Sequence, residues 1–234
     1  MIEFFMKRFF TALLFVPLLC SEPALAQIRQ IGVRGLALER ADPLPERYIK
    51  VKDGYELIQF LYSQPVQLII AYTESALPLF EKKKNDEGEE VYEIAEKVPV
   101  PASAKGILLL GWKGEEGPRY LAIDDNFPAA KYNNWLMINA ASKPVAFRIG
   151  KENKPFIVKA SSAENYKVNV PEGRGAAVLG QAEMEGEAKT FYSTYWPIRE
   201  KERSIVIFFE REDRMRLRKI SDSLFVPKKS PDEE

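Results

Sequence analysis

The amino-acid sequence predicts an all-β protein with the antiparallel β-sandwich architecture. Short runs of alternating or wholly apolar residues recur along the chain, separated by clusters of Pro, Gly, Asn and charged residues, which is the pattern of strands and turns. These runs follow one another at intervals of about 10 residues, which favours antiparallel sandwiches over a parallel sheet with crossover helices. A similarity between two halves of the chain further predicts two related sandwich-like units from an internal duplication.

The predicted strands are short, and no segment is long enough to be a convincing helix. We expect strands at Tyr48–Val51, Glu56–Tyr62, Val66–Tyr72, Val91–Val98, Gly106–Trp112, Tyr120–Ile123, Trp135–Asn139, Val145–Ile149, Phe156–Lys159, Tyr166–Val170, Ala176–Gly180, Lys189–Tyr195, Ser204–Glu210 and Met215–Ile220. Short helical turns near Ala76–Lys84 and Ala129–Asn133 are alternatives, because three or four apolar residues fit either period.

Two pairs of segments indicate the duplication. Tyr62–Ala71 (YSQPVQLIIA) can be aligned with Ala141–Gly150 (ASKPVAFRIG), and Val98–Pro101 (VPVP) with Val168–Pro171 (VNVP), in the same order. We infer two copies of a unit of about 75 residues. The copies could form two small sandwiches or pair their sheets into a single larger one, and the pattern does not choose between these arrangements.

The predicted organisation has four parts. Residues 1–26 are a cleavable signal peptide, 27–128 the first β-sandwich unit, 129–225 the second unit, and 226–234 a disordered tail.

The first 26 residues have the layout of a secretory signal. Lys7 and Arg8 precede the apolar run Phe9–Leu19, and the small residues Ala24 and Ala26 stand at −3 and −1 before Gln27. We therefore expect cleavage before Gln27 and a periplasmic or secreted mature protein.

Two alternatives to a cleavable signal are disfavoured by the same segment. The apolar run is interrupted by Pro17 and is much shorter than the roughly 20 residues that a membrane-spanning helix needs, so no membrane span is expected after cleavage. Lipid attachment at Cys20 is disfavoured by Leu19, because lipoprotein signals generally need a small residue there. Translation could begin at Met1 or at Met6.

Composition excludes many functions. The 34 basic residues balance the 34 acidic ones, which argues against a nucleic-acid partner. The chain has no histidine, and its single cysteine, Cys20, lies in the signal. This excludes Ser-His-Asp and Cys-His catalysis, most zinc sites, haem ligation by His or Cys, iron–sulfur clusters and redox dithiols. Carboxylate, lysine and tyrosine chemistry is left, and no catalytic residue, metal or cofactor is expected.

Asp124 and Asp125 are adjacent carboxylates at the end of an apolar strand. Two carboxylates can act as acid and base or bind a hard cation. Neighbouring strand residues point to opposite faces, however, so a strand-to-loop turn in which they cap backbone amides is the favoured interpretation. They are speculative binding residues.

Phe191–Trp196 is the densest aromatic stretch. Tyr192, Tyr195 and Trp196 are speculative binding residues of a sugar-stacking platform. On a regular strand, Phe191 and Tyr195 face one way while Tyr192 and Trp196 face the other, so at least one set is expected to fill the core.

Two charged segments are expected to be solvated. Arg214, Arg216 and Arg218 alternate with apolar residues and are predicted to line the outer face of a strand. Lys82–Glu90 is interpreted as a loop between strands, and its acidic residues lack the ligand spacing of a known calcium loop.

Trp135–Asn139, Pro144–Gly150 and Val168–Pro171, with Arg203–Phe209 as a following strand, resemble the layout of uncharacterised exported β-sandwich proteins of environmental Gram-negative bacteria. The resemblance covers the second unit and implies a sandwich fold. It implies no catalytic residues, because that group has no assigned activity.

The function expected from these observations is that of a non-enzymatic exported binding or assembly protein of the cell envelope. Its partner would be an unknown envelope protein or glycan. The alternative is a carbohydrate-binding module or a carboxylate-dependent glycan hydrolase.

Overall fold

The computed structural model describes residues 28–40, 43–66, 68–114, 116–125, 131–150, 154–171, 173–184, 186–199, 201–211 and 214–223. Within these ranges the chain forms 16 β-strands in four sheets and no helix, which confirms the predicted all-β class. The predicted signal peptide with its cleavage site, the boundary between residues 128 and 129, and the tail 226–234 lie outside the described residues.

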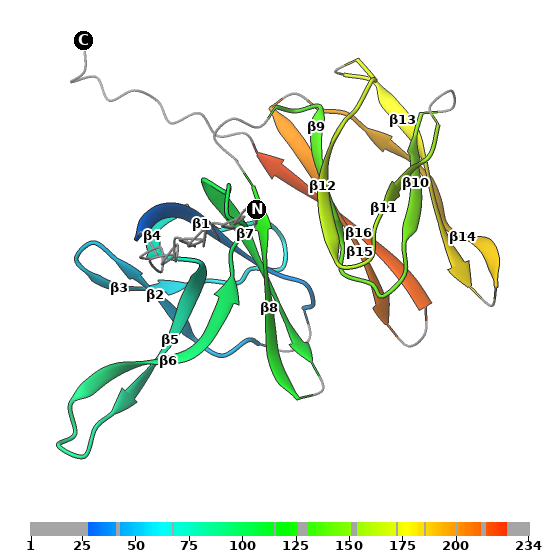
Figure 1. The fold of residues 1–234 in the computed structure, drawn as a ribbon. Helices are drawn as coiled ribbons and strands as arrows, with labels where there is room; N and C mark the ends of the chain where they lie inside the picture. Colours follow the sequence, from blue (N-terminus) through cyan, green and yellow to red (C-terminus); the bar gives the residue numbers. More distant parts are fainter. Residues whose placement is uncertain are drawn as a thin grey trace, which may run out of the picture.

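The first eight strands constitute what we call the first unit. They are β1 (Arg29–Ala37), β2 (Arg47–Val51), β3 (Gly54–Ile58), β4 (Ile69–Thr73), β5 (Ala76–Lys84), β6 (Glu90–Pro99), β7 (Gly106–Gly114) and β8 (Gly117–Asp124). The second unit contains β9 (Asn134–Asn139), β10 (Val145–Ile149), β11 (Phe156–Val158), β12 (Ser162–Lys167), β13 (Gly175–Met184), β14 (Glu187–Pro197), β15 (Glu202–Arg211) and β16 (Arg214–Ser223). Figure 1 shows the two units side by side.

The two units repeat one strand order. The first unit has sheets β4-β1-β7-β8 and β3-β2-β5-β6, and the second has β12-β9-β15-β16 and β11-β10-β13-β14. Each strand of the second unit thus occupies the place of the strand eight positions earlier. The hydrogen-bonded pairs are antiparallel in both units except β1 with β7 and β9 with β15, which are parallel. Two related sandwich units, as predicted, are therefore present.

The segments from which the duplication was predicted are not equivalent in the structure. Tyr62–Ala71 leads into β4, whereas Ala141–Gly150 leads into β10, and these strands have different places in the repeated order. Val98–Pro101 begins with the last two residues of β6, whereas Val168–Pro171 follows the end of β12. The alignment was wrong because a turn followed by an apolar strand recurs at many places in a sandwich.

Each unit has its own hydrophobic core between its two sheets. In the first unit the core contains Ile31 and Leu109 on one sheet and Ile49 and Leu79 on the other. The core of the second unit is more aromatic and includes Trp135, Phe147, Trp196 and Phe208.

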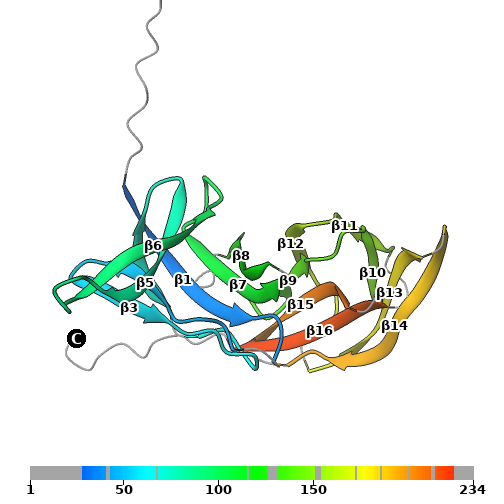
Figure 2. The ribbon, with the colours of Figure 1, turned by 90° about the horizontal axis from the view of Figure 1, so that it is seen from below.

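A third core lies between the units. It joins residues of β1, β7 and β8, such as Leu36 and Leu108, to residues of β9, β15 and β16, such as Leu136 and Ile207. We call the two sheets that meet there the inner sheets and the other two the outer sheets. Because the central strands of the inner sheets are buried on both faces, they appear in the sequence as continuous apolar runs such as Ile107–Gly111. Figure 2 shows the units next to each other, with the two inner sheets between the two outer sheets.

The sequence interpretation missed β1. This strand is buried over most of its length but contains a charged residue, Arg34, between two glycines, which breaks the apolar run. Gly35 is required by a close approach: a Cβ atom there would lie 2.1 Å from the carbonyl oxygen of Gln59. Residues after β3 bind β1 directly, because the Ala37 amide donates to the Leu61 carbonyl.

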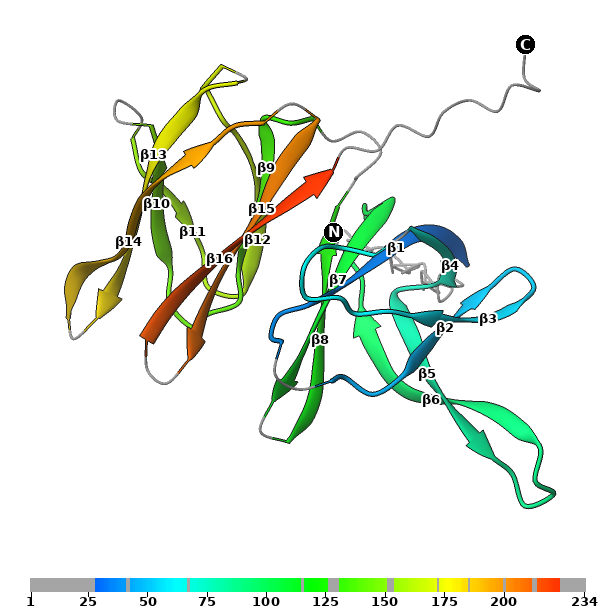
Figure 3. The same ribbon diagram turned by 180° about the vertical axis from the view of Figure 1, so that it is seen from behind.

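The segment Lys82–Glu90 is not a loop in its entirety. Lys82–Lys84 continue β5 and Glu90 begins β6, and the β5–β6 hairpin projects from the first unit (Figure 3). The turn is organised by Asn85, whose side-chain oxygen accepts hydrogen bonds from the amides of Glu87 and Glu89. The helical alternative for Ala76–Lys84 is also excluded, since this range is β5.

Candidate binding surface

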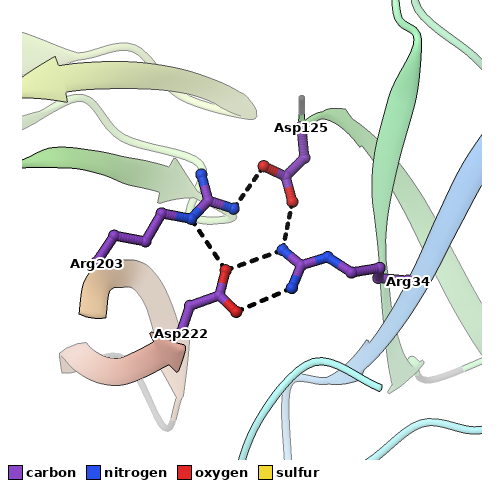
Figure 4. Close-up of polar contacts among 4 residues, drawn as sticks. All are labelled: Arg34, Asp125, Arg203 and Asp222. Atoms are coloured by element: carbon purple, nitrogen blue, oxygen red, sulfur yellow. Dashed lines mark hydrogen bonds and ion pairs between the residues drawn. The ribbon is translucent and has the colours of Figure 1, made fainter. Parts of the chain in front are cut away.

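Asp125 belongs to a buried charge cluster between the units (Figure 4). We use the term charge cluster for Arg34, Asp125, Arg203 and Asp222. Arg34 binds Asp125 at 2.6 Å and Asp222 at 2.9 Å, and Arg203 binds the same two carboxylates at 2.6 and 2.9 Å. Both oxygens of Asp125 therefore accept a hydrogen bond from an arginine. Each arginine bridges the two units.

The charge cluster is buried and formally neutral. The four side chains are between 1 and 4% exposed. Burial opposes the charge on Arg34, but the hydrogen bond and charge of Asp222, together with those of Asp125, raise the pKa of Arg34 above its usual value. Removing one member of such a cluster leaves an uncompensated buried charge, which is strongly destabilising. The charge cluster thus links the two inner sheets to each other.

The two aspartates of the charge cluster occupy equivalent positions. The hairpin β7–β8 closes with Gly114 opposite Gly117, and β15–β16 closes with Arg211 opposite Arg214. Asp125 and Asp222 follow these turns at the same distance along the chain. The duplicated framework therefore supplies both acids.

The structure does not place Asp124 and Asp125 at one ligand. Asp124 is exposed at the end of β8, whereas Asp125 is enclosed by two arginines. The amide of Asp125 donates to the carbonyl of Gly106, so this residue continues the ladder beyond the strand. The expected turn, in which the side chains cap backbone amides, is not what engages Asp125.

The aromatic stretch on β14 does not form one exposed platform either. Trp196 is 6% exposed in the second core, and its indole N–H donates to the hydroxyl of Tyr192 at 3.0 Å. Tyr195 is 65% exposed, and its ring covers Gly175. A β-bulge between Thr190 and Tyr192 interrupts the alternation, so Phe191 and Tyr192 both pack against the second core. The prediction that these two residues face opposite sides was wrong because the sequence does not reveal the bulge.

Arg218 was also predicted wrongly as a solvated residue. It is buried, donates to the backbone carbonyls of Ala37 and Leu38 in the first unit, and lies 3.5 Å over the ring of Tyr62. Burial lowers the pKa of Arg218 to about 10. Arg214 and Arg216, nearer the hairpin turn, are exposed as expected.

Lys219 is the lysine that most resembles a reactive group. Burial lowers its pKa, with further lowering by Arg199, and its ammonium lies 5.5 Å from the ring centre of Trp196. The adjoining cavity, which Glu202 also lines, has a volume of only about 10 Å³. This is the space of a single water molecule, so the site has no room for a substrate.

The outer sheet of the first unit carries a cluster of aromatic and aliphatic side chains on its solvent side. Along each strand, side chains that point outward alternate with side chains that point into the core, as the pleat requires. The inward set includes Ile49, Ile58, Leu77 and Leu79. We name as the aromatic face the outward residues Tyr48, Tyr55, Leu57, Phe80, Tyr92 and Ile94, which come from β2, β3, β5 and β6.

Ring contacts organise the aromatic face. Tyr55 and Tyr92 stack with ring centres 4.2 Å apart. Tyr48 makes a T-shaped contact with Tyr92, and Phe80 makes one with Tyr55. The Tyr48 hydroxyl donates to the carboxylate of Glu46, and this hydrogen bond raises the pKa of Tyr48. Such contacts restrict the rings, so the face is preorganised.

Aliphatic side chains complete the aromatic face and are well exposed. Leu57 is 36% and Ile94 51% exposed. Ile94 lies opposite Phe80 across the β5–β6 pair, next to a β-bulge. Several large apolar groups in one exposed area are uncommon on a monomeric surface without a binding role.

A pocket continues this surface toward the β4–β5 turn. It has a volume of about 400 Å³, and its lining includes Ile28, Tyr72, Pro78 and Ile94. Ile94 therefore belongs to both the pocket and the aromatic face. A mainly apolar cavity of this size can accept a side chain or a small ligand.

The sequence interpretation missed the aromatic face because its residues are distributed over four strands. The available signal was the alternation of Tyr48, Tyr55 and Tyr92 with charged neighbours in predicted strand segments. Alternation of this kind cannot by itself distinguish an outward aromatic residue from an inward one.

No known family model matches the chain, and no curated protein sequence is significantly similar to it. The described residues contain no helix that is long and apolar enough to cross a membrane. Within the same ranges, no three residues among His, Cys, Asp and Glu are grouped so that they could hold a metal ion.

Proposed function

We propose that this protein is a non-enzymatic, exported binding or assembly component of the cell envelope that acts through the aromatic face. The observation that carries this proposal is the gathering of apolar side chains beside a pocket of about 400 Å³. Leu57 and Ile94 are exposed there, the three tyrosines are partly buried, and Phe80 is buried. On the corresponding sheet of the second unit, the exposed apolar residues Ile157 and Tyr195 lie on the opposite edge strands β11 and β14, with two strands between them.

Three ionisable residues that could have taken part in carboxylate or lysine chemistry bear on the proposal that the protein is not an enzyme. Asp125 is occupied by the charge cluster, and Lys219 adjoins a cavity too small for a substrate. Asp124 is exposed at the end of β8, and its neighbour Asp125 points into the charge cluster. These observations favour a role that depends on binding alone.

Export is proposed from the sequence, since the order of Lys7, Arg8, Phe9–Leu19 and Ala24–Ala26 is that of a cleavable signal. Recovery of the protein from the periplasm or medium with Gln27 at its amino terminus is expected. Recovery of the uncleaved chain from the cytosol would contradict export.

A comparison of two variants tests the binding surface. Ile94→Ser removes an exposed apolar group from the aromatic face, and Ile157→Ser removes one that is 54% exposed on β11 of the second unit. We expect the tagged wild-type protein and Ile157→Ser to recover the same partner from an envelope fraction, and Ile94→Ser to lose it. Equal recovery by all three proteins would refute the proposed surface.

Carbohydrate binding is the second candidate, and the exposure of Tyr195 is the observation that favours it. Titration of tryptophan fluorescence with polysaccharides tests it. A saturable change that Tyr195→Ala abolishes would support this candidate over the first.

A further inference from the structure

We propose, building on the function proposed above, that the aromatic face binds an extended segment of a partner protein that carries carboxylates next to aliphatic or aromatic side chains. The inference concerns the chemistry of the partner, and the excess of lysines on the outward side of the outer sheet leads to it.

Lysines outnumber acidic residues on the outward side of the outer sheet in the first unit. The outward rows contain Lys50 on β2, Lys82 and Lys84 on β5, and Lys97 on β6. The same outward rows contain one acidic residue, Glu90. The inward side of these strands carries Glu81, Glu93 and Glu96, of which the first two bind the inward Lys83. The whole chain has equal numbers of acidic and basic residues, so this basic border is a local feature.

Two of the lysines are available to a ligand. Lys82 already binds Glu90 at 2.6 Å, whereas no described carboxylate pairs with Lys50 or Lys97. Both line the pocket, in which Glu74 is the opposing charge. A ligand with carboxylates would place them at these ammonium groups, where its apolar groups would also meet Ile94.

The apolar part of the surface fits a protein segment better than a sugar. Sugars stack on exposed ring faces, but Tyr55 and Tyr92 turn one face of each ring toward the other at an interplanar angle of 11°. Leu57 and Ile94 supply aliphatic contact area, which is the complement of apolar side chains. Because β6 is an edge strand, a segment that runs along it reaches the aromatic face and the pocket together.

Selection from random displayed peptides of 10 residues, the length of β6, tests this inference. The full-length protein is the bait, and Ile94→Ser is used to remove peptides that bind elsewhere. We expect the selected peptides to combine Asp or Glu with Leu, Ile, Phe or Trp. Their affinity for the double variant Lys50→Gln/Lys97→Gln should be about tenfold lower than for the wild-type protein. Their affinity for the wild-type protein should also fall as the salt concentration rises, because salt screens the attraction between the lysines and the carboxylates.

The matched control is Lys159→Gln/Lys167→Gln, which removes two exposed lysines of the second unit and should leave the affinity unchanged. Circular dichroism and thermal unfolding establish that both double variants fold. If the basic border is only a solvated surface, the two double variants will bind the peptides equally.

Other outcomes would overturn the inference in distinguishable ways. Selected peptides without acidic residues would remove the carboxylate requirement, and failure to select any peptide would remove the extended segment. Binding of polygalacturonate that depends on Lys50 and Lys97, without any peptide binding, would assign the face to an anionic glycan. These outcomes leave the proposed function standing if Ile94→Ser still fails to recover the envelope partner that the wild-type protein recovers. The proposed function itself fails only if Ile94→Ser recovers that partner as well as the wild-type protein does.

Discussion

The two units share a strand order but use their outer sheets differently. In the first unit the outward side carries stacked tyrosines and Ile94 beside a pocket lined by two lysines. In the second unit the exposed apolar residues Ile157 and Tyr195 lie on the opposite edge strands β11 and β14. The inner sheets, in contrast, are alike in burial and meet in a common core. The two units thus share the faces that hold the molecule together and differ at their outer faces, where the first unit carries the surface that we propose for binding.

The strongest test of this comparison concerns the charge cluster. We expect Asp125→Ala to lower the free energy of unfolding by about 3–5 kcal/mol, because it leaves Arg34 and Arg203 buried without this partner. Chemical denaturation measures the change. Asp124→Ala, at the exposed neighbouring position, should change it by less than about 0.5 kcal/mol. Similar effects of the two substitutions would show that the charge cluster does not join the units.

A second prediction compares the two faces of one inner strand. Leu108 on β7 faces the second unit and Leu109 faces the first core, and both are fully buried. Each Leu→Ala substitution should cost about 2–5 kcal/mol in denaturant unfolding, since each removes a packed side chain. If the units were separate bodies joined by a flexible link, Leu108→Ala would cost far less than Leu109→Ala.

A third prediction concerns Arg218, which connects β16 to the end of β1. Arg218→Ala should destabilise the protein by about 1–3 kcal/mol, because the carbonyls of Ala37 and Leu38 lose their donor and Tyr62 loses the overlying guanidinium. Arg216→Ala is the matched control on the same strand and should be nearly neutral. Thermal unfolding of both variants distinguishes a contact between units from a solvated surface.

The smallest effect on stability is expected at the outer faces. Ile94→Ser and Ile157→Ser should each change the free energy of unfolding by less than about 1 kcal/mol, because both side chains are about half exposed. The variants should then differ in binding alone. A large loss of stability in Ile94→Ser would mean that this residue supports the fold, and its loss of a partner could no longer be assigned to the surface.

Apolar patterning predicted the architecture well where burial was complete. Continuous runs such as Ile107–Gly111 and Ile205–Phe209 marked strands that are covered on both faces. The same reasoning failed at β1, because Arg34 is balanced by Asp125 and Asp222, which lie far away in the sequence. A buried charge becomes compatible with a core strand only through such partners, which a local pattern does not contain.

The candidate surface was less predictable than the fold. The stretch Phe191–Trp196 attracted attention because its aromatic residues are adjacent, yet Trp196 belongs to the core. Tyr55 and Tyr92 stack although they lie on β3 and β6, and only the strand order β3-β2-β5-β6 brings their faces to the same side. Tertiary pairing, which determines this proximity, was not available from residue spacing.

Site-specific cross-linking in intact cells tests the central claim most directly. A photoreactive residue is placed at position 94 on the aromatic face or at position 157 on the outer sheet of the second unit, where the native isoleucines are similarly exposed. We predict a discrete cross-linked product in the envelope from position 94 and none from position 157. Discrete products from position 157 alone, or the same products from both positions, would contradict the assignment of binding to the aromatic face.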